Sequence, residues 1–214
     1  QRQMCIRDSI QVNETGENAI VLFAGANHDI QGQLVQQAIS DALPGDWMLT
    51  QNETNCIEEA MRLAKENGLK IAFNPAPMTD AVNQLPLELV DLFILNEVEA
   101  EGIAGSRDIN QIEAYFNEHY SNAEVIITLG KKGAVMIRRD SKISVPAFKV
   151  EAVDTTAAGD TFIGYFLASY IKENNAEKAL INACAASAIA VTRFGAAPSI
   201  PVAEEVQVFL EKHR

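Results

Sequence analysis

Short apolar runs alternate with segments of helical periodicity along most of this chain, and this alternation limits the possible folds more than any other feature. A strand that is followed by a crossover helix returns to the same sheet as a parallel neighbour. The runs that we expect to form strands are 47–51, 70–74, 92–96, 124–129, 134–138 and 144–150. The segments that we expect to form helices are 31–42, 54–67, 97–104, 109–118, 159–173, 176–193 and 202–212. The pattern predicts an α/β fold with a three-layer, doubly wound, mostly parallel sheet.

Polar residues lie at or just past the ends of several predicted strands. In open α/β sheets, ligands bind just beyond the carboxyl ends of the strands. We therefore expect a site along one edge of the sheet that includes Glu53, Asn74, Asn96 and Thr128.

The first 24 residues differ from the rest of the chain. Residues 1–9 show neither periodicity nor a helix cap, and we interpret them as an extraneous or disordered leader. Residues 10–24 contain two β-prone runs around a turn-rich segment, which predicts a hairpin. We expect residues 25–214 to form the α/β domain.

Composition narrows the class of protein. A chain of 214 residues with 48% hydrophobic and 21% charged residues describes a soluble globular domain. The net charge of −12 argues against a nucleic-acid partner, because a phosphate backbone would be repelled. No apolar run approaches the ~20 residues that a membrane span needs. The three cysteines lie far apart in no metal-ligand or disulfide pattern, which favours a reducing, cytoplasmic setting.

The segment from Asp154 to Phe162 carries the strongest chemical signal. Small residues at Ala157, Ala158 and Gly159 come just before a helical apolar pattern, so the helix should begin there with its amides uncovered. Such amides attract an anion, and Asp160 could then accept a proton from a hydroxyl, as phosphoryl transfer to an alcohol requires. The competing interpretation is that Asp160 caps the helix and the small residues serve packing; the segment alone leaves both open.

Asn96 and Glu99 follow an apolar run and stand one helical turn apart. Mg²⁺ prefers oxygen ligands and keeps several waters, so one carboxylate beside nucleotide phosphates would be enough. The alternative is an asparagine helix cap followed by acidic residues in the first turn. Such caps are common, which favours this interpretation for the pair alone.

The turn from Thr128 to Gly133 joins two predicted strands. Its two glycines permit a tight turn with exposed amides, and Lys131 or Lys132 could meet a phosphate. It is not a Walker loop, because the chain has no such motif. An ordinary turn with solvated lysines would look the same.

Several motifs together resemble one family in order and spacing, from about Ile10 to the C-terminus. They are Ala24-Gly25-Ala26-Asn27, Asn74-Pro75-Ala76-Pro77, Asn96 to Glu101, Thr128-Leu129-Gly130, Asp154 to Phe162 and Ala188 to Arg193. The sequence resembles the ribokinase family of carbohydrate kinases. Family members begin with a further segment that carries an Asp and a Gly-Gly-Lys-type sugar motif. Since the chain shows no such segment, we expect a family member without its N-terminal part, and residues 10–24 as the remnant of a small β lid.

The resemblance implies ATP-dependent phosphorylation of the primary hydroxyl of a sugar, D-ribose giving ribose 5-phosphate. It also implies a role for each matching position. Asp160 is the base, and Ala157, Ala158 and Gly159 form the hole for the transferred phosphoryl group. ATP is implied to bind at Asn96, Glu99, Thr128, Gly130, Lys132, Gly133, Gly159 and Cys184, where Cys184 offers chiefly an apolar wall to adenine.

Further roles follow from the same resemblance. Mg²⁺ is implied at Glu99 and K⁺ at Asp154, Thr156, Ala190, Arg193, Gly195 and Ser199. The sugar is implied to contact Glu53 and Asp160, and the lid to make a homodimer contact. For Asp154 the alternative is a structural bond to a neighbouring loop, and for Glu53 it is a surface glutamate that caps a helix.

Three other functions remain open at this point. The chain could belong to a kinase of the same family for deoxyribose, fructose, a keto-deoxy sugar acid or a nucleoside. It could be a non-catalytic sugar- or nucleotide-binding relative, although Asp160 and its small neighbours are present. It could also be an inactive polypeptide that binds nucleotide weakly and catalyses nothing.

Overall fold

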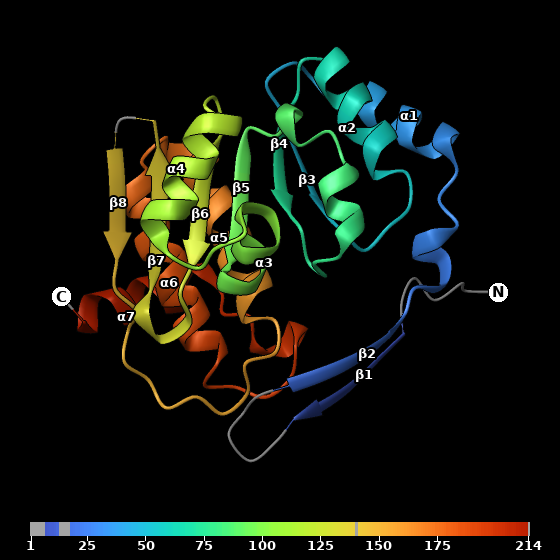
Figure 1. Ribbon diagram of the computed structural model, residues 1–214. Helices are drawn as coiled ribbons and strands as arrows, with labels where there is room; N and C mark the ends of the chain where they lie inside the picture. Colours follow the sequence, from blue (N-terminus) through green and yellow to red (C-terminus); the bar gives the residue numbers. More distant parts are fainter. Residues whose placement is uncertain (1–6, 13–17, 140, 214) are drawn as a thin grey trace. The chain divides into compact units, whose positions relative to one another are not determined.

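The computed structural model describes residues 7–12, 18–139 and 141–213 (Figure 1). The strands are β1 (Arg7–Val12), β2 (Asn18–Phe23), β3 (Trp47–Gln51), β4 (Lys70–Asn74), β5 (Leu92–Asn96), β6 (Glu124–Thr128), β7 (Ala134–Arg138) and β8 (Ser141–Val145). The helices are α1 (Gly32–Ser40), α2 (Ile57–Glu66), α3 (Glu97–Ala104), α4 (Ile109–His119), α5 (Ala158–Glu173), α6 (Ala176–Ala190) and α7 (Ala203–Lys212).

The main sheet has the strand order β3-β4-β5-β6-β7-β8. The pairs β3/β4, β4/β5 and β5/β6 are parallel. The connections from β6 to β7 and from β7 to β8 contain no crossover helix, so these last strands run antiparallel to their neighbours. The predicted α/β fold with a mostly parallel sheet is confirmed.

Strands β1 and β2 form a separate two-stranded sheet. The two runs of the predicted hairpin are therefore strands, while most of its predicted turn, residues 13–17, lies outside the described residues. Strand β1 begins at Arg7, within the segment that we interpreted as a leader.

The chain divides into two compact units, one built mainly from residues 22–128 and the other mainly from residues 143–214. In the first unit, Phe73 and Phe93 are fully buried and meet edge to face, and Phe93 does the same with Phe116 of α4. Helix α3 packs on β5 and β6, and α4 packs on α3 (Figure 1). Strand β3 is less covered, with Leu49 46% exposed.

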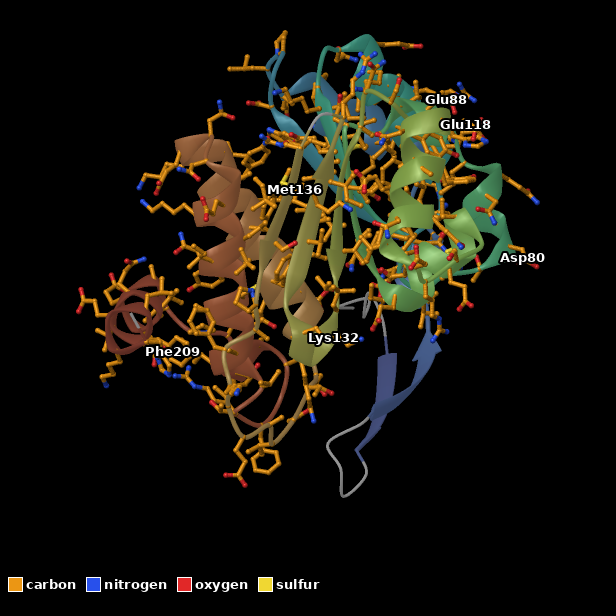
Figure 2. The ribbon with its side chains drawn as sticks, turned by 60° about the vertical axis from the view of Figure 1, so that its left-hand side comes forward. Asp80, Glu88, Glu118, Lys132, Met136 and Phe209 are labelled. Carbon is orange, nitrogen blue, oxygen red and sulfur yellow. The ribbon has the colours of Figure 1, made fainter. Side chains whose placement is uncertain are left out.

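In the second unit, helices α5 and α6 pack closely along their length. Helix α6 carries many buried alanines, such as Ala179, Ala183 and Ala186, and small side chains permit close packing of a helix against its neighbours. Phe148 packs edge to face on Phe209 of α7, with ring centroids 5.2 Å apart; Figure 2 labels Phe209 on this helix.

The largest error of the strand prediction is at β8, which we expected at residues 144–150. The strand ends at Val145 instead. Pro146 follows and has no N–H to donate to a neighbouring strand. The apolar residue Phe148, which suggested a strand, instead packs against Phe209.

Within the described residues, the helices are too short or too polar for any of them to cross a membrane.

Candidate functional site

A polar cluster lies at the carboxyl ends of β3, β4 and β5 in the first unit. The amide of Asn74 on β4 is buried, and its Nδ2 donates to Ile94 O at 2.8 Å and to Glu99 Oε2 at 3.0 Å. Gln51 at the end of β3 donates from Nε2 to Asn74 Oδ1 at 2.9 Å. Asn96, the last residue of β5, donates from its backbone N to Glu99 Oε2 and from Nδ2 to Glu99 Oε1, both at 2.8 Å. The strand ends thus converge on one carboxylate.

The carboxylate of Glu99 is buried, with the residue only 5% exposed. Burial raises its pKa, because the charged form loses water, and the hydrogen bonds from Asn96 and Asn74 partly reverse this effect. The charge of Glu99 therefore depends on these donors.

The start of α3 is closed by its own side chains. Asn96 Oδ1 accepts from the backbone N of Val98 and of Glu99, each at 2.9 Å, and Glu99 bonds back to Asn96 N in a capping box. The cap interpretation of Asn96 is therefore what the structure shows. The metal role of this pair stays a prediction, and among the described residues no three acidic, Cys or His side chains gather as metal ligands would.

Thr128 ends β6 directly opposite Asn96 in the register of β5 and β6, and its Oγ1 donates to Leu95 O at 3.2 Å. The predicted edge alignment of Asn96 and Thr128 is thus present. Glu53 lies just past β3 and is half-buried.

The turn after β6 holds a short 3-10 helix, Gly130–Lys132. Gly130 and Gly133 both have positive φ, 53° and 105°. A Cβ on Gly133 would lie 2.0 Å from Val145 O, so no larger residue fits there without moving the backbone. Lys131 and Lys132 are exposed, and Figure 2 shows Lys132 at this turn. The turn is compact, and its lysines are accessible.

The start of α5, in the second unit, has no side-chain cap. Ala157 precedes the helix in the left-handed region, with φ 58° and ψ 13°, and contributes no cap hydrogen bond. Ala158 N donates to Thr155 O at a long 3.3 Å, so its amide is not entirely bare. Gly159 is exposed, and a Cβ built on it meets nothing within 4 Å. Asp160 is exposed in the first turn beside it.

Asp154 holds the segment before α5 in place. Its carboxylate is buried, and it accepts from Thr156 N and from Gly195 N, each at 2.9 Å. Hydrogen bonds from the Thr156 side chain and from the Gly195 and Thr156 amides lower the pKa of Asp154. The structural alternative for Asp154, a bond to a neighbouring loop, is therefore present, and its role toward K⁺ stays a prediction.

Of the other residues assigned to K⁺, Ala190 ends α6, and Arg193, Gly195 and Ser199 lie between α6 and α7. Ala190 O accepts from Arg193 N at 3.0 Å, and the Arg193 guanidinium pairs with Glu205 Oε1 at 2.6 Å. Ser199 is fully buried and donates from Oγ to Ala196 O at 2.7 Å.

Two residues of α6, Cys184 and Ser187, bear on the predicted nucleotide site and on the start of α5. Cys184 is buried, and burial raises the pKa of its thiol to about 12, so it stays uncharged at neutral pH. Ser187 donates from Oγ to Ala158 O at 3.1 Å, which ties α6 to the first turn of α5. No sequence signal predicted this contact, because a serine among alanines carries no motif.

In the second unit, a helix start without a side-chain cap and with an exposed carboxylate in its first turn fits phosphoryl transfer. Residues 8–203 match the sequence model of the pfkB family carbohydrate kinases, and the chain belongs to this family.

Its relatives narrow the class to ribokinase-like enzymes. Ribokinase from Haemophilus influenzae is 39% identical over 208 residues, which cover 94% of this chain and 68% of that protein. Deoxyribokinase from Salmonella typhi is 30% identical over 213 residues, with the same coverage of 94% and 68%. The structure of a ribokinase from Cryptococcus neoformans in complex with ADP superposes with a TM-score of 0.78 at 28% identity, covering 97% of this chain and 72% of that one. The expected family is confirmed, and the chain is a ribokinase-like carbohydrate kinase.

Proposed function

We propose that the protein transfers the γ-phosphoryl group of ATP to the primary hydroxyl of D-ribose and forms ribose 5-phosphate and ADP. The identity of 39% with a ribokinase exceeds the 30% identity with a deoxyribokinase, which favours ribose over deoxyribose. Deoxyribose is the second candidate, because that relative aligns over the same share of this chain.

The observation that carries this proposal is the exposed carboxylate of Asp160 beside the open Gly159 at the start of α5. Asp160 takes the proton of the sugar hydroxyl as the oxygen attacks the γ-phosphorus, and the bond from that phosphorus to the ADP oxygen breaks. The helix start stabilises the negative charge of the transferred group through its amides.

For the nucleotide, we assign the turn of Gly130, Lys132 and Gly133 to the phosphates, with the exposed Gly130 and Lys132 making the contact and Thr128 beside them. Cys184 supplies an apolar contact for the base. The ADP complex of the Cryptococcus ribokinase supports a nucleotide site in this family. Glu53 is assigned to the sugar.

Bound Mg²⁺ would neutralise charge on the phosphates. The residues present fit such an ion: a carboxylate has about four lone-pair positions, and the three described hydrogen bonds to Glu99 use three of them. With the amide of Asn96 beside it, Glu99 would hold the ion directly or through water.

For K⁺ the proposed donors are also oxygens, which suit a hard cation. They come from the Asp154 carboxylate, Thr156, Ser199 and the backbone carbonyls of Ala190, Arg193 and Gly195. The carbonyl of Ala190 accepts one hydrogen bond and has a second lone pair for an ion.

We also propose that the β1–β2 sheet makes a homodimer contact. A two-stranded sheet presents unpaired edges that a second copy can cover. Sedimentation of the protein with and without residues 7–23 tests this assignment: loss of a dimer on deletion supports it, and an unchanged mass contradicts it.

The kinase proposal is tested by measuring ADP release with ATP, Mg²⁺ and K⁺ in the presence of ribose, 2-deoxyribose or fructose. We expect the highest kcat/KM for ribose. A higher value for deoxyribose or fructose would change the substrate, and nucleotide binding without transfer to any sugar would contradict the catalytic role.

A further inference from the structure

Asn74 occupies an unusual place for an amide side chain, because it is 6% exposed and joins three strands. It accepts from Gln51 of β3 at 2.9 Å and donates to Ile94 O of β5 at 2.8 Å. Its second donor bond, at 3.0 Å, goes to Glu99 at the start of α3. The strand prediction placed Asn74 at the sheet edge but assigned no chemistry to it.

The orientation of this amide is fixed by its partners. The carbonyl of Ile94 can only accept, so Nδ2 of Asn74 must face it, and Oδ1 then faces the donor on Gln51. Turning the amide over would break all three bonds at once. Asn74 therefore presents an N–H to Glu99 in a single geometry.

Glu99 depends on that N–H. Two of its three described donors belong to Asn96, which ends β5 and caps the helix that carries Glu99, and the third comes from Asn74 on β4. The donors of Asn96 hold the carboxylate at the end of β5. The bond from Asn74 adds a second attachment, to the neighbouring strand β4.

We propose that Asn74, oriented by Gln51, is a positioning residue that fixes the Glu99 carboxylate for the metal-bound nucleotide. This inference rests on the proposed kinase function. Groups that orient a metal-binding carboxylate act through it, and their loss weakens metal affinity by about 10- to 100-fold.

The test is calorimetric titration of the protein with ADP, once with Mg²⁺ and once with a chelator. We expect Asn74→Ala to weaken Mg·ADP binding about tenfold or more and to leave metal-free ADP binding unchanged. Gln51→Ala should weaken Mg·ADP binding by a smaller factor, since the amide of Asn74 keeps its bond to Ile94. Asn182→Ala is the matched control, because that amide donates to Ser169 Oγ at 3.0 Å and lies outside the cluster; it should change neither affinity.

A double-mutant cycle separates positioning from a purely structural role. In the Glu99→Gln background, Asn74→Ala should have little further effect on Mg·ADP affinity, because the group through which Asn74 acts has been changed. Equal losses in both backgrounds, or equal losses with and without Mg²⁺, would overturn the inference. If Asn74→Ala does not fold, as judged by its circular dichroism spectrum, Gln51→Ala decides in the same cycle.

Mg·ADP binding by the unmodified protein distinguishes a failure of the proposed kinase function from a failure of the positioning role of Asn74. If it binds no Mg·ADP, the proposed function fails, and the positioning role fails with it. If it binds Mg·ADP and the Asn74 and Gln51 variants bind as well, only the positioning role is wrong.

Discussion

Helices α3 and α5 both carry a carboxylate at their third residue, Glu99 in one and Asp160 in the other, yet the two helix starts are built in opposite ways. Glu99 is buried and bonded to its own cap residue, Asn96. Asp160 is exposed, and the residue before its helix, Ala157, has no side chain that could cap it. The same position in a helix thus holds a buried, hydrogen-bonded carboxylate in one unit and an exposed carboxylate in the other.

The residue before each helix accounts for the difference. The side chain of Asn96 accepts hydrogen bonds from two backbone N–H groups of α3, so those groups are not available to a ligand. Ala157 has no side chain that could accept from the first amides of α5, and its left-handed conformation is strained by about 1 kcal/mol. A helix start that is open and strained is what an anion site needs, whereas a closed one stabilises the fold.

The largest expected effect is that of Asp160→Asn. If the exposed acid accepts the proton, kcat should fall about 10²- to 10⁴-fold, while ADP affinity stays within a small factor. Steady-state kinetics and calorimetry measure the two quantities. Asp80→Asn, at an exposed acid elsewhere (Figure 2), is the control and should leave kcat unchanged. Turnover that survives in Asp160→Asn would remove Asp160 from the mechanism.

Two glycines of α5 allow a matched comparison along one helix. Gly159 and Gly164 are both exposed, and a Cβ on either meets nothing within 4 Å. Gly159→Glu places a negative charge at the proposed phosphoryl site and should lower kcat/KM about 100-fold or more, without lowering the melting temperature. Gly164→Glu should keep normal kinetics. Equal kinetics of the two variants would show that the start of α5 holds no anion.

Asp154 and Asp160 lie in one segment but differ in burial. Asp154 is buried and hydrogen-bonded, whereas Asp160 is exposed. Asp154→Asn should lower the free energy of unfolding by about 2 kcal/mol at pH 7, since its new N–H faces the donors Thr156 N or Gly195 N. Urea unfolding measures this loss.

The pH dependence of that loss has a definite sign. The pKa of Asp154 is lowered in the folded state, so its stabilisation is present above the ordinary value of 3.8 and disappears as the pH falls through the lower folded value. The difference in unfolding free energy between the wild type and Asp154→Asn should therefore shrink below about pH 4. A difference that stays constant down to pH 2.5 would contradict this account of Asp154.

The smallest expected effects concern the two cap positions themselves. Asn96→Ala removes a cap and should cost about 1 kcal/mol of unfolding free energy. Ala157→Gly removes the left-handed strain and should stabilise the protein by about 0.5 kcal/mol after the added flexibility of glycine in the unfolded chain is counted. Thermal or urea unfolding of both variants checks the pair. A loss of stability in Ala157→Gly as large as in Asn96→Ala would show that the two helix starts are alike.

Much of the fold followed from pattern, because strands such as β4 and β5 are continuous apolar runs that end in asparagine. The position of Asn96 at the end of a strand and its role as a helix cap could be predicted, because both depend only on the residues next to it in the sequence. The contact between Gln51 and Asn74 could not, because it depends on the register of two strands whose order no local pattern gives. The left-handed conformation of Ala157 could not be predicted either, because an alanine by itself disfavours it. The hydrogen-bonded segment around Asp154 holds it in place.

We propose that the start of α5, and not that of α3, receives the transferred group through its backbone. A crystal structure with Mg²⁺, ADP and aluminium fluoride would show which helix start holds the fluoride. We expect a fluoride about 3 Å from Gly159 N, with Asp160 facing the acceptor position and Asn96 still capping Val98 and Glu99. Aluminium fluoride bound away from Gly159, or held by the amides of an opened α3 start, would contradict it.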